Sequence, residues 1–415
     1  MAPSDRMIED IETNEFTKWY EEYTNVHVEW NLVPQDNMKT KVNLVLSSGE
    51  YPDVIMMGGL TQSQELMFGK QGILIPLNDL IEEYGIETKK IFEEYEVAKD
   101  LMTMPDGNIY SLPNINDCFH CSMSQKYWIY TPWLEKLGLD MPETTDDYYN
   151  VLKAFKEQDP NGNGIKDEIP LAGAATGWHT NIDGFLMCAF IYNDAETTGG
   201  KRLLMRDKKV IAAYTTDEWR EGLRYIKKLY REDLIAPESF TQQAEQLKQM
   251  GENPDVPILG SCAAGGFGMF SQQYGSRGRW LEFKPMPPLK GPNGYRVADY
   301  DPYLAIGTGE FVIMKDCKIP EVAFRWGDAF YEQEITLRAG YGVPDVDWKY
   351  AEPGEIGING KPAIWEQILE FGIVQNQCWR EMGIKNRSND LRLGAVSKGD
   401  EDLETILYNE TYFCV

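Results

Sequence analysis

The sequence predicts an α/β protein built from two domains. Short β-branched segments alternate with amphipathic segments of helical period, which is the pattern of an α/β architecture. The chain has 415 residues, more than a single hydrophobic core usually spans, so a division into two domains is expected. No internal repeat and no low-complexity linker interrupts the alternation.

The N-terminal part of the chain shows the alternation most clearly. Aromatic residues recur at helical spacing in residues 10–24, and residues 26–33 then alternate as a strand does. Residues 37–49 predict a helix that ends at Gly49, because glycine adopts the left-handed conformation of a helix C-terminus without steric cost. Residues 51–58 predict a buried strand. The segments that follow are helices at 61–72, 74–85 and 89–102 and a hairpin turn at 104–109.

The rest of the chain continues the pattern. Threonine side chains accept hydrogen bonds from the first amides of a helix, so Thr144 or Thr145 is expected to cap one. Pro320 is expected to open another helix, since proline is tolerated in the first helical turn. The remaining expected elements are a strand at 122–130, two helices within 131–158, an amphipathic helix at 216–235 and a strand beginning at Phe311.

The composition excludes several classes of function. The formal net charge is −26, which repels nucleic acid and anionic membranes at long range, so neither is an expected partner. No apolar run approaches the ~18 residues that a membrane span requires. The 11 Trp and 23 Tyr residues favour a sugar-binding site, because such sites use flat amphipathic rings, although most of these rings are expected to pack in the core.

The seven cysteines do not form the dense framework of a small disulfide-rich domain. Cys118 and Cys121 form a C-x-x-C motif in a polar loop that precedes a strand. A redox-active C-x-x-C should instead open a helix, whose N-terminus lowers the thiol pKa. The motif therefore predicts structural thiols or a local disulfide rather than redox catalysis. A zinc site would need more ligands nearby, and the chain has only three histidines.

The segment "DPNGNGIKDE", residues 159–168, has the spacing of a calcium-binding loop. The oxygen-bearing side chains at loop positions 1, 3, 5 and 9 are Asp159, Asn161, Asn163 and Asp167. Gly164 occupies position 6, where the turn is sharp, and position 7, Ile165, needs only its backbone carbonyl. An EF-hand has a bidentate glutamate at position 12, which is Pro170 here, and Glu168 is its natural replacement. The loop is either the functional site or part of the framework.

Several stretches stand in the same order as in one known family. They are "VNLVLSSGEYPDVIMM", "QGILIPLNDLIEEYG", "PDGNIYSLP", "TPWLEKLGLDMPETTDDYYNVLKAFKEQDPNGNGIKDEIPL", "FVIMKDCKIPEVAFRWGDAFY" and "GINGKPAIW". Over most of its length the chain resembles the extracellular solute-binding proteins of sugar ABC importers (family 1). Within that family it is similar to the lipoprotein branch that includes alginate-oligosaccharide-binding proteins.

The resemblance implies a periplasmic-binding-protein-like fold, in which two α/β lobes joined by a hinge hold the ligand in a cleft between them. The expected lobes are residues 1–125 with 300–340, and residues 126–299 with 341–415. The resemblance also implies a structural Ca²⁺ in the 159–168 loop. Its ligands would be Asp159, Asn161, Asn163, the carbonyl of Ile165, Asp167 and Glu168.

The family further implies partners and a location. The expected ligand is a carbohydrate, the expected partner is the membrane permease of an ABC importer, and the protein is expected to be a monomer. Family members begin with an export signal, a lipid-attachment cysteine and a first strand, and they continue past the point that corresponds to residue 415. Both termini are therefore expected to be truncated, and the full-length precursor is expected to be an extracellular, cell-surface lipoprotein.

Loops at strand ends are expected to supply the ligand contacts. Trp178 is the leading candidate, because its small-residue loop "GAATGWHTN" cannot bury an indole by itself. The further candidates are Trp348, Trp379, Asn114, Asn181, Asp299, Tyr303 and Asn376. A neutral oligosaccharide is preferred, because an anionic sugar would call for convergent Arg or Lys. Arg338 and Arg380 could serve, but each also fits a solvated helix face.

Two other classes of function remain open. One is a calcium-stabilised glycoside hydrolase or polysaccharide lyase. A hydrolase needs two carboxylates about 5–9 Å apart across the scissile bond, which a sequence with 66 carboxylates neither shows nor excludes. The other is a calcium-loop interaction module of the dockerin type, which needs paired loops, whereas one copy occurs here. The preferred prediction is a binding protein without enzymatic activity.

Overall fold

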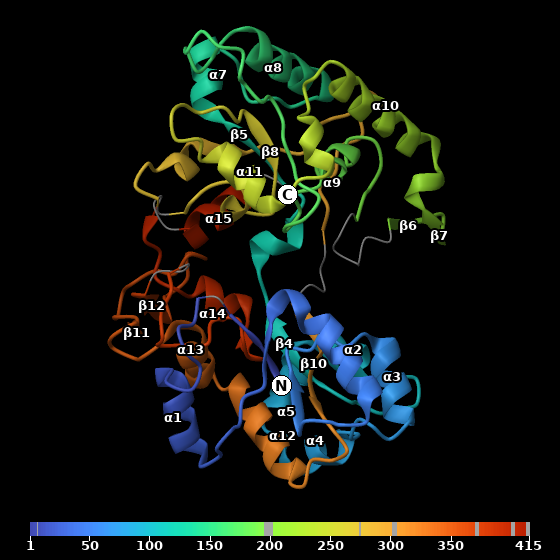
Figure 1. Cartoon of the computed structure of the whole chain (residues 1–415), viewed down its shortest axis with the longest axis vertical. Helices are drawn as coiled ribbons and strands as arrows, with labels where there is room; N and C mark the ends of the chain where they lie inside the picture. Colours follow the sequence, from blue (N-terminus) through green and yellow to red (C-terminus); the bar gives the residue numbers. More distant parts are fainter. Residues whose placement is uncertain are drawn as a thin grey trace. The chain divides into compact units, whose positions relative to one another are not determined.

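The chain folds into two compact units (Figure 1). The computed structural model describes residues 1–5, 7–194, 202–273, 275–300, 305–369, 373–399 and 403–411. Unit 1 consists of Met1–Cys118 with Tyr303–Ser397, and unit 2 of Phe119–Pro302 with Lys398–Val415. Each unit has its own sheet and its own hydrophobic core.

Residues 341–397 belong to unit 1, whereas the sequence analysis places them in the other lobe. Contacts between distant segments explain this correction. Trp379 packs edge-on against Phe16, with ring centroids 4.8 Å apart. Strand β13 (Asn386–Arg387) also pairs in parallel with β4 (Leu112–Asn116).

The main sheet of unit 1 has four strands in the order β13-β4-β10-β3. Strand β10 (Ile306–Ile313) is antiparallel to both of its neighbours, β4 and β3 (Val54–Met56). Successive residues of a strand point to opposite faces, so Phe311 and Ile313 enter one core cluster and Val312 enters another. The sheet is therefore packed by apolar side chains on both faces.

The other elements of unit 1 are nine helices and two small sheets among the described residues (Figure 1). The helices are α1 (Glu15–Thr24), α2 (Met38–Ser48), α3 (Gln62–Lys70), α4 (Asn78–Tyr84), α5 (Glu87–Glu94), α6 (Glu96–Met102), α12 (Pro320–Asp328), α13 (Gln333–Tyr341) and α14 (Asn389–Leu393). The small sheets are parallel β1 (Ala2–Ser4) with β2 (Leu32–Pro34), and antiparallel β11 (Trp348–Tyr350) with β12 (Trp365–Gln367). Two predictions are confirmed: helix α2 ends at Gly49, which has a φ of 81°, and helix α12 begins at Pro320.

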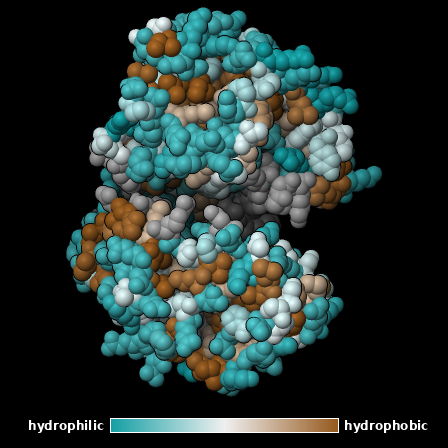
Figure 2. All heavy atoms as spheres, in the orientation of Figure 1, coloured by the Kyte–Doolittle hydropathy of each residue, from teal (hydrophilic) through white to brown (hydrophobic). Residues whose placement is uncertain are grey.

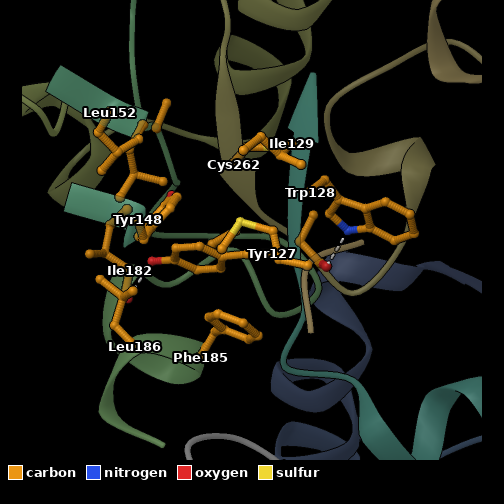
Figure 3. Close-up of a cluster of buried hydrophobic side chains, with 14 of the residues drawn as sticks. Tyr127, Trp128, Ile129, Tyr148, Leu152, Ile182, Phe185, Leu186 and Cys262 are labelled. Carbon is orange, nitrogen blue, oxygen red and sulfur yellow. Dashed lines mark hydrogen bonds between the residues drawn. The ribbon is translucent and has the colours of Figure 1, made fainter. Parts of the chain in front are cut away.

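Unit 2 is built around β5 (Tyr127–Tyr130), all four residues of which are buried. It lies between β8 (Ser261–Ala263) and β9 (Phe283–Pro285), and both pairings are antiparallel. Figure 3 shows the rings of Tyr127 and Trp128 on opposite sides of this strand. Their polar atoms are satisfied inside the core, because the Tyr127 hydroxyl donates to the Ile182 carbonyl (2.6 Å) and Trp128 Nε1 to the Ala264 carbonyl (2.8 Å).

The remaining elements of unit 2 are helices and one hairpin. They are α7 (Thr131–Leu137), α8 (Thr145–Glu157), α9 (Ile182–Met187), α10 (Asp217–Arg231), α11 (Ala244–Gly251), α15 (Leu403–Thr411) and the antiparallel pair β6 (Leu203–Arg206) and β7 (Lys209–Ala212). Thr144 caps α8 in a reciprocal capping box with Asp147, which resolves the choice between Thr144 and Thr145. The expected strand at 122–130 is shorter than predicted, because Phe119–Met123 forms a 3₁₀ turn.

The face shown in Figure 2 is mainly hydrophilic, with smaller hydrophobic areas scattered over it. Among the described residues, no helix combines the length and the apolar character that crossing a membrane would require.

Glu65 on α3 is a buried carboxyl group in unit 1. It is 0% exposed, and neither of its carboxylate oxygens has a hydrogen-bond partner. Burial raises the pKa of Glu65 to about 7, and the charge of Glu310 raises it as well. Because the folded-state pKa of Glu65 is raised, ionising this carboxyl costs more in the folded than in the unfolded protein. The free energy of unfolding is therefore higher while Glu65 is protonated, and this stability is lost as the pH rises through about 7.

Replacing Glu65 with Gln should therefore stabilise unit 1 at pH 8 but not at pH 4.5. The amide remains neutral, so the variant avoids the cost of ionising a buried carboxyl, on the order of 2–3 kcal/mol at pH 8. Denaturant unfolding of both proteins at the two pH values measures the difference. Glu50→Gln, which changes an exposed carboxylate of the same unit, is the control. Equal stability of the Glu65→Gln variant and wild type at pH 8 would contradict the prediction.

Candidate functional site

The 159–168 loop is wrapped around the carboxylate of Asp159. This carboxylate accepts hydrogen bonds from the backbone N–H groups of Gly162 (2.9 Å), Asn163 (3.1 Å) and Gly164 (3.0 Å). The two glycines have φ values of 77° and 75°, a conformation that side chains with a Cβ rarely adopt. The sequence therefore folds locally into a tight turn that gathers the loop's oxygen atoms.

The remaining predicted ligands lie in the same turn. The side-chain amides of Asn161 and Asn163 each donate to a different oxygen of Asp167, at 2.8 and 3.0 Å. Glu168 Oε1 is buried and has no hydrogen-bond partner. Burial raises the pKa of Glu168, and the charges of Asp167 and Asp159 raise it further.

These features fit a hard divalent cation. Three carboxylates repel one another inside one turn, and a bound cation would relieve that repulsion and give the buried Glu168 oxygen a partner. A nearby ammonium group, that of Lys136, donates to the Pro160 carbonyl at 2.6 Å. The donor set consists of carboxylate, amide and carbonyl oxygens, which calcium prefers.

Trp178 lies on a glycine platform in unit 2. A Cβ at Gly265 would sit only 2.5–2.9 Å from three atoms of the six-membered ring, so the close approach of the indole requires glycine there. The Trp178 carbonyl accepts from the Gly265 amide (2.9 Å), and its own amide donates to Met269 Sδ (3.3 Å). The residue is half-buried, so part of the indole remains exposed.

Two imidazoles border the same indole. The rings of His120 and His179 meet it at interplanar angles of 79° and 66°, with centroids 5.9 and 5.3 Å away. Burial lowers the pKa of His179 to about 4, and the charge of Lys126 adds to this effect. The ring is therefore neutral at pH 7, and its Nδ1 lies 2.7 Å from Gln125 Nε2.

His120, Gln125 and the role of Gly265 and Gly266 were not recognised from the sequence. Phe267, which follows these glycines, is 1% exposed and packs on Trp128 with ring centroids 4.3 Å apart. The glycine pair itself was the available signal, since adjacent glycines often mark a place where another group approaches the backbone closely.

Two other candidates also lie in unit 2. Asn181, three residues after Trp178, is half-buried and precedes α9 as its N-cap residue. Asp299 is 2% exposed and accepts a hydrogen bond from the Tyr192 hydroxyl at 3.4 Å. Tyr303 lies outside the described residues. Trp178 and Asn181 are therefore the candidates of this unit that are half-buried rather than fully buried.

In unit 1 the structure corrects the expectation for two tryptophans. Trp348 and Trp379 are 0% and 1% exposed. Trp348 Nε1 donates to the Gly342 carbonyl (2.9 Å), and Trp379 Nε1 donates to Thr17 Oγ1 (2.7 Å). Both indoles are core residues with satisfied N–H groups, so neither offers a face to a sugar here, and we leave them out of the proposed site.

The two asparagines of unit 1 are half-buried. Asn114, in β4, accepts a hydrogen bond from the Lys385 amide at 3.2 Å. Asn376 accepts from the Asp10 amide (3.2 Å) and donates to Thr13 Oγ1 (3.1 Å), which ties it to the N-terminal segment. Asn376 therefore has a structural role that its sequence context does not reveal.

Cys118 and Cys121 are each disulfide-bonded, so the alternative of two structural thiols does not hold for this motif. Cys188, Cys262, Cys317 and Cys378 are free and buried. Together with His120, Cys118 and Cys121 are the one group of three His, Cys, Asp or Glu ligands gathered within 4.8 Å in the described part of the chain, and the oxidised sulfurs do not act as thiolate ligands.

The chain passes three times between two α/β units. This arrangement defines the periplasmic-binding-protein-like class of fold. The chain belongs to the bacterial extracellular solute-binding protein family, whose pattern matches residues 7–335. This finding confirms the fold class and the family that the sequence analysis predicts.

Two curated proteins are similar in sequence. The fructooligosaccharide ABC transporter substrate-binding protein FusA of Streptococcus pneumoniae serotype 4 is 32% identical over 329 residues, which are 78% of this chain and 58% of FusA. Lipoprotein LipO of Bacillus subtilis is 31% identical over 230 residues, which are 52% of this chain and 40% of LipO. The chain thus spans less than two thirds of either relative.

Solved structures of FusA are similar to the whole chain. The match to the complex of FusA with kestose covers 98% of this chain and 82% of the FusA chain in that structure, with a TM-score of 0.79 and 26% identity. An EF-hand mutant of FusA in complex with fructo-nystose covers 100% and 82%, with a TM-score of 0.79 and 25% identity.

Proposed function

We propose that this protein is the ligand-binding component of an ABC importer and that it captures a neutral oligosaccharide. Membership of the solute-binding family and the similarity to FusA support an importer component. The observation that carries the carbohydrate assignment is the half-buried Trp178 on its glycine platform. Because FusA is described as a fructooligosaccharide-binding protein, short fructooligosaccharides such as kestose are the first ligands to test.

The chemistry of a sugar fits this surface of unit 2. One face of a sugar ring carries C–H groups, and its edge carries hydroxyls. Stacking on the exposed part of the Trp178 indole buries the C–H patch at about 25 cal/mol per Å². Asn181, in the same loop, is placed to bind hydroxyls, which orients the sugar more than it adds affinity. Asp299 and Asn114 remain candidates for further hydroxyl contacts.

We also propose that the 159–168 loop holds one structural calcium ion. The buried, unpartnered Glu168 oxygen and the neighbouring carboxylates support this assignment, and a solved structure of FusA is described as an EF-hand mutant. The loop leads directly into residues 169–172, which bridge to Leu259, Ile235 and Cys262, and then into the Trp178 loop. The ion therefore has a framework role, in which it fixes the entry to this segment.

The proposal also includes a membrane partner and a location at the cell surface. The partner is the importer's membrane permease, to which a monomeric binding protein delivers its ligand. The name of LipO supports a lipoprotein at the outer surface of the cell. A binding protein releases its ligand chemically unchanged, which separates this proposal from a glycoside hydrolase or lyase.

Trp178→Ala should weaken kestose binding by about 5- to 150-fold, because it removes a stacked aromatic contact worth ~1–3 kcal/mol. Isothermal titration calorimetry measures the affinity, and circular dichroism checks that the fold is intact. Tyr214→Ala, which removes an exposed ring elsewhere in unit 2, is the matched control and should bind as wild type does. An affinity unchanged by Trp178→Ala would refute the stacking role.

Removal of calcium should lower the melting temperature of the wild-type protein. The Asp159→Ala variant should have a lower melting temperature than wild type, and this temperature should no longer depend on chelator. Asp159 also accepts three backbone hydrogen bonds, so Glu168→Gln is the sharper variant. It removes one charge from a carboxylate whose buried oxygen has no partner. Thermal unfolding with and without EDTA measures both effects, and Asp140→Ala, an exposed site in the same unit, is the control. Full chelator sensitivity in both loop variants would place the ion elsewhere.

Oligosaccharide recovered after prolonged incubation with the protein should be chemically unaltered. Chromatography and a reducing-end assay on kestose and on longer fructooligosaccharides test this expectation. Product that forms steadily and follows the protein through successive purification steps would overturn the binding-protein proposal in favour of the hydrolase alternative.

A further inference from the structure

Strand β10 of unit 1 contains a bulge where it passes β4. Its register with β4 shifts between Gly307 and Phe311. Within this interval Gly309 has a φ of 71°, and a Cβ there would lie 2.1 Å from the Leu60 carbonyl oxygen, so the position requires glycine. A bulge redirects the side chains beside it, and the residue after Gly309 is Glu310. The direction of the Glu310 side chain is therefore set by its contacts rather than by strand alternation.

The segment that follows β3 holds this bulge. The Met57 amide donates to the Glu310 carbonyl at 2.5 Å. The Leu60 amide donates to the Gly309 carbonyl at 3.1 Å. Between them, the Gly59 amide donates to the side-chain oxygen Glu310 Oε2 at 3.2 Å. Both the backbone and the carboxylate of Glu310 are therefore fixed by one short segment of unit 1.

The second carboxylate oxygen of Glu310 remains open. Oε1 accepts no hydrogen bond in the described part of the chain, and it is not a fully buried atom. Burial of the half-buried side chain raises the pKa of Glu310, and the hydrogen bond from Gly59 offsets part of this effect. The ionised group thus has fewer hydrogen-bond donors than it would have in water, and a ligand that donates to Oε1 would supply one.

The neighbouring carboxyl group, Glu65, does not offer the same contact. It is 0% exposed, and both of its oxygens are buried. The two groups are close enough for the charge of Glu310 to raise the pKa of Glu65. Of this pair, Glu310 is the one that a ligand can reach.

Gly307 leaves space beside Glu310 Oε1. It pairs with Asn114 in the register of β10 with β4. A Cβ on Gly307 would lie 3.4 Å from Glu310 Oε1 and 3.4 Å from the Asn114 carbonyl oxygen, which are ordinary contact distances. A methyl group at this position is therefore tolerated, but it covers one side of Oε1. The half-buried Asn114, already a candidate for a hydroxyl contact, lies close to the Glu310 carboxylate across this glycine.

We propose that Glu310 is a ligand-binding residue of unit 1 and that its Oε1 accepts a hydrogen bond from a hydroxyl of the oligosaccharide. The inference rests on the proposed sugar-binding function. The edge of a sugar ring supplies hydroxyl donors, and an ionised carboxylate forms shorter and stronger hydrogen bonds with them than a neutral acceptor does. Because the carboxylate is already held by the Gly59 amide, little further ordering of the side chain opposes binding.

The experiment measures kestose affinity by isothermal titration calorimetry for two variants of the whole chain. Glu310→Gln keeps the size of the side chain and an oxygen for the Gly59 amide but removes the charge, and we expect it to weaken binding about 5- to 20-fold. Gly307→Ala leaves Glu310 unchanged and places a methyl group beside Oε1, so it should weaken binding by a similar factor. Glu366→Gln, which changes another half-buried carboxylate of unit 1, is the control and should bind as wild type does.

The melting temperatures of the ligand-free proteins separate a ligand contact from a structural role. Both variants should unfold at the same temperature as wild type. If Glu310→Gln weakens binding only together with a lowered melting temperature, and Gly307→Ala binds as wild type does, Glu310 merely holds the segment after β3 and the inference is wrong. Wild-type affinity in both variants would also overturn it, while leaving the proposed function in place. A wild-type protein that binds neither kestose nor fructo-nystose would contradict the proposed ligand class, and this inference with it.

Discussion

The buried strand β5 determines the position of every part of the proposed sugar platform. Trp128 in this strand donates to the Ala264 carbonyl, and the Ala264 amide donates to the Lys126 carbonyl (3.1 Å) directly before the strand. These two bonds fix the segment that continues into Gly265 and Gly266, on which the indole of Trp178 lies. The side chain of Lys126 holds His120. The platform is therefore an extension of the core of unit 2 rather than a free loop.

This dependence explains why loop residues can present a rigid binding surface. The loop of Trp178 is held by hydrogen bonds to two other segments. The Gly265 amide, after β8, donates to the Trp178 carbonyl (2.9 Å), and the Ala175 amide donates to the Gln242 carbonyl (2.9 Å). On its N-terminal side the same loop follows residues 169–172, which bridge to three other segments of unit 2. A calcium ion in the 159–168 loop would stabilise that entry from the outside, while β5 stabilises the platform from within.

The local features of the fold could be predicted from the sequence because each depends on neighbouring residues. The Thr144 cap, the helix end at Gly49 and the turn around Asp159 are all of this kind. The burial of Trp379 could not be predicted, because Thr17 and Phe16, which contact it, are more than three hundred residues away in the chain. The same reason explains the error in the domain boundary. The composition of the Trp178 loop predicts an indole that the loop cannot bury, whereas the contact between this indole and His120 is tertiary and has no local signal.

The family relationship and the local geometry support different parts of the account. Membership of the family fixes the fold and the class of protein, and the arrangement around Trp178 adds a specific place and orientation for the ligand. The most direct test of that central claim is a crystal structure of the protein with kestose. The account predicts electron density for a sugar ring stacked about 4 Å from the exposed part of the Trp178 indole, with a hydroxyl bound to Asn181. Kestose bound at another place, with solvent over Trp178, would contradict it.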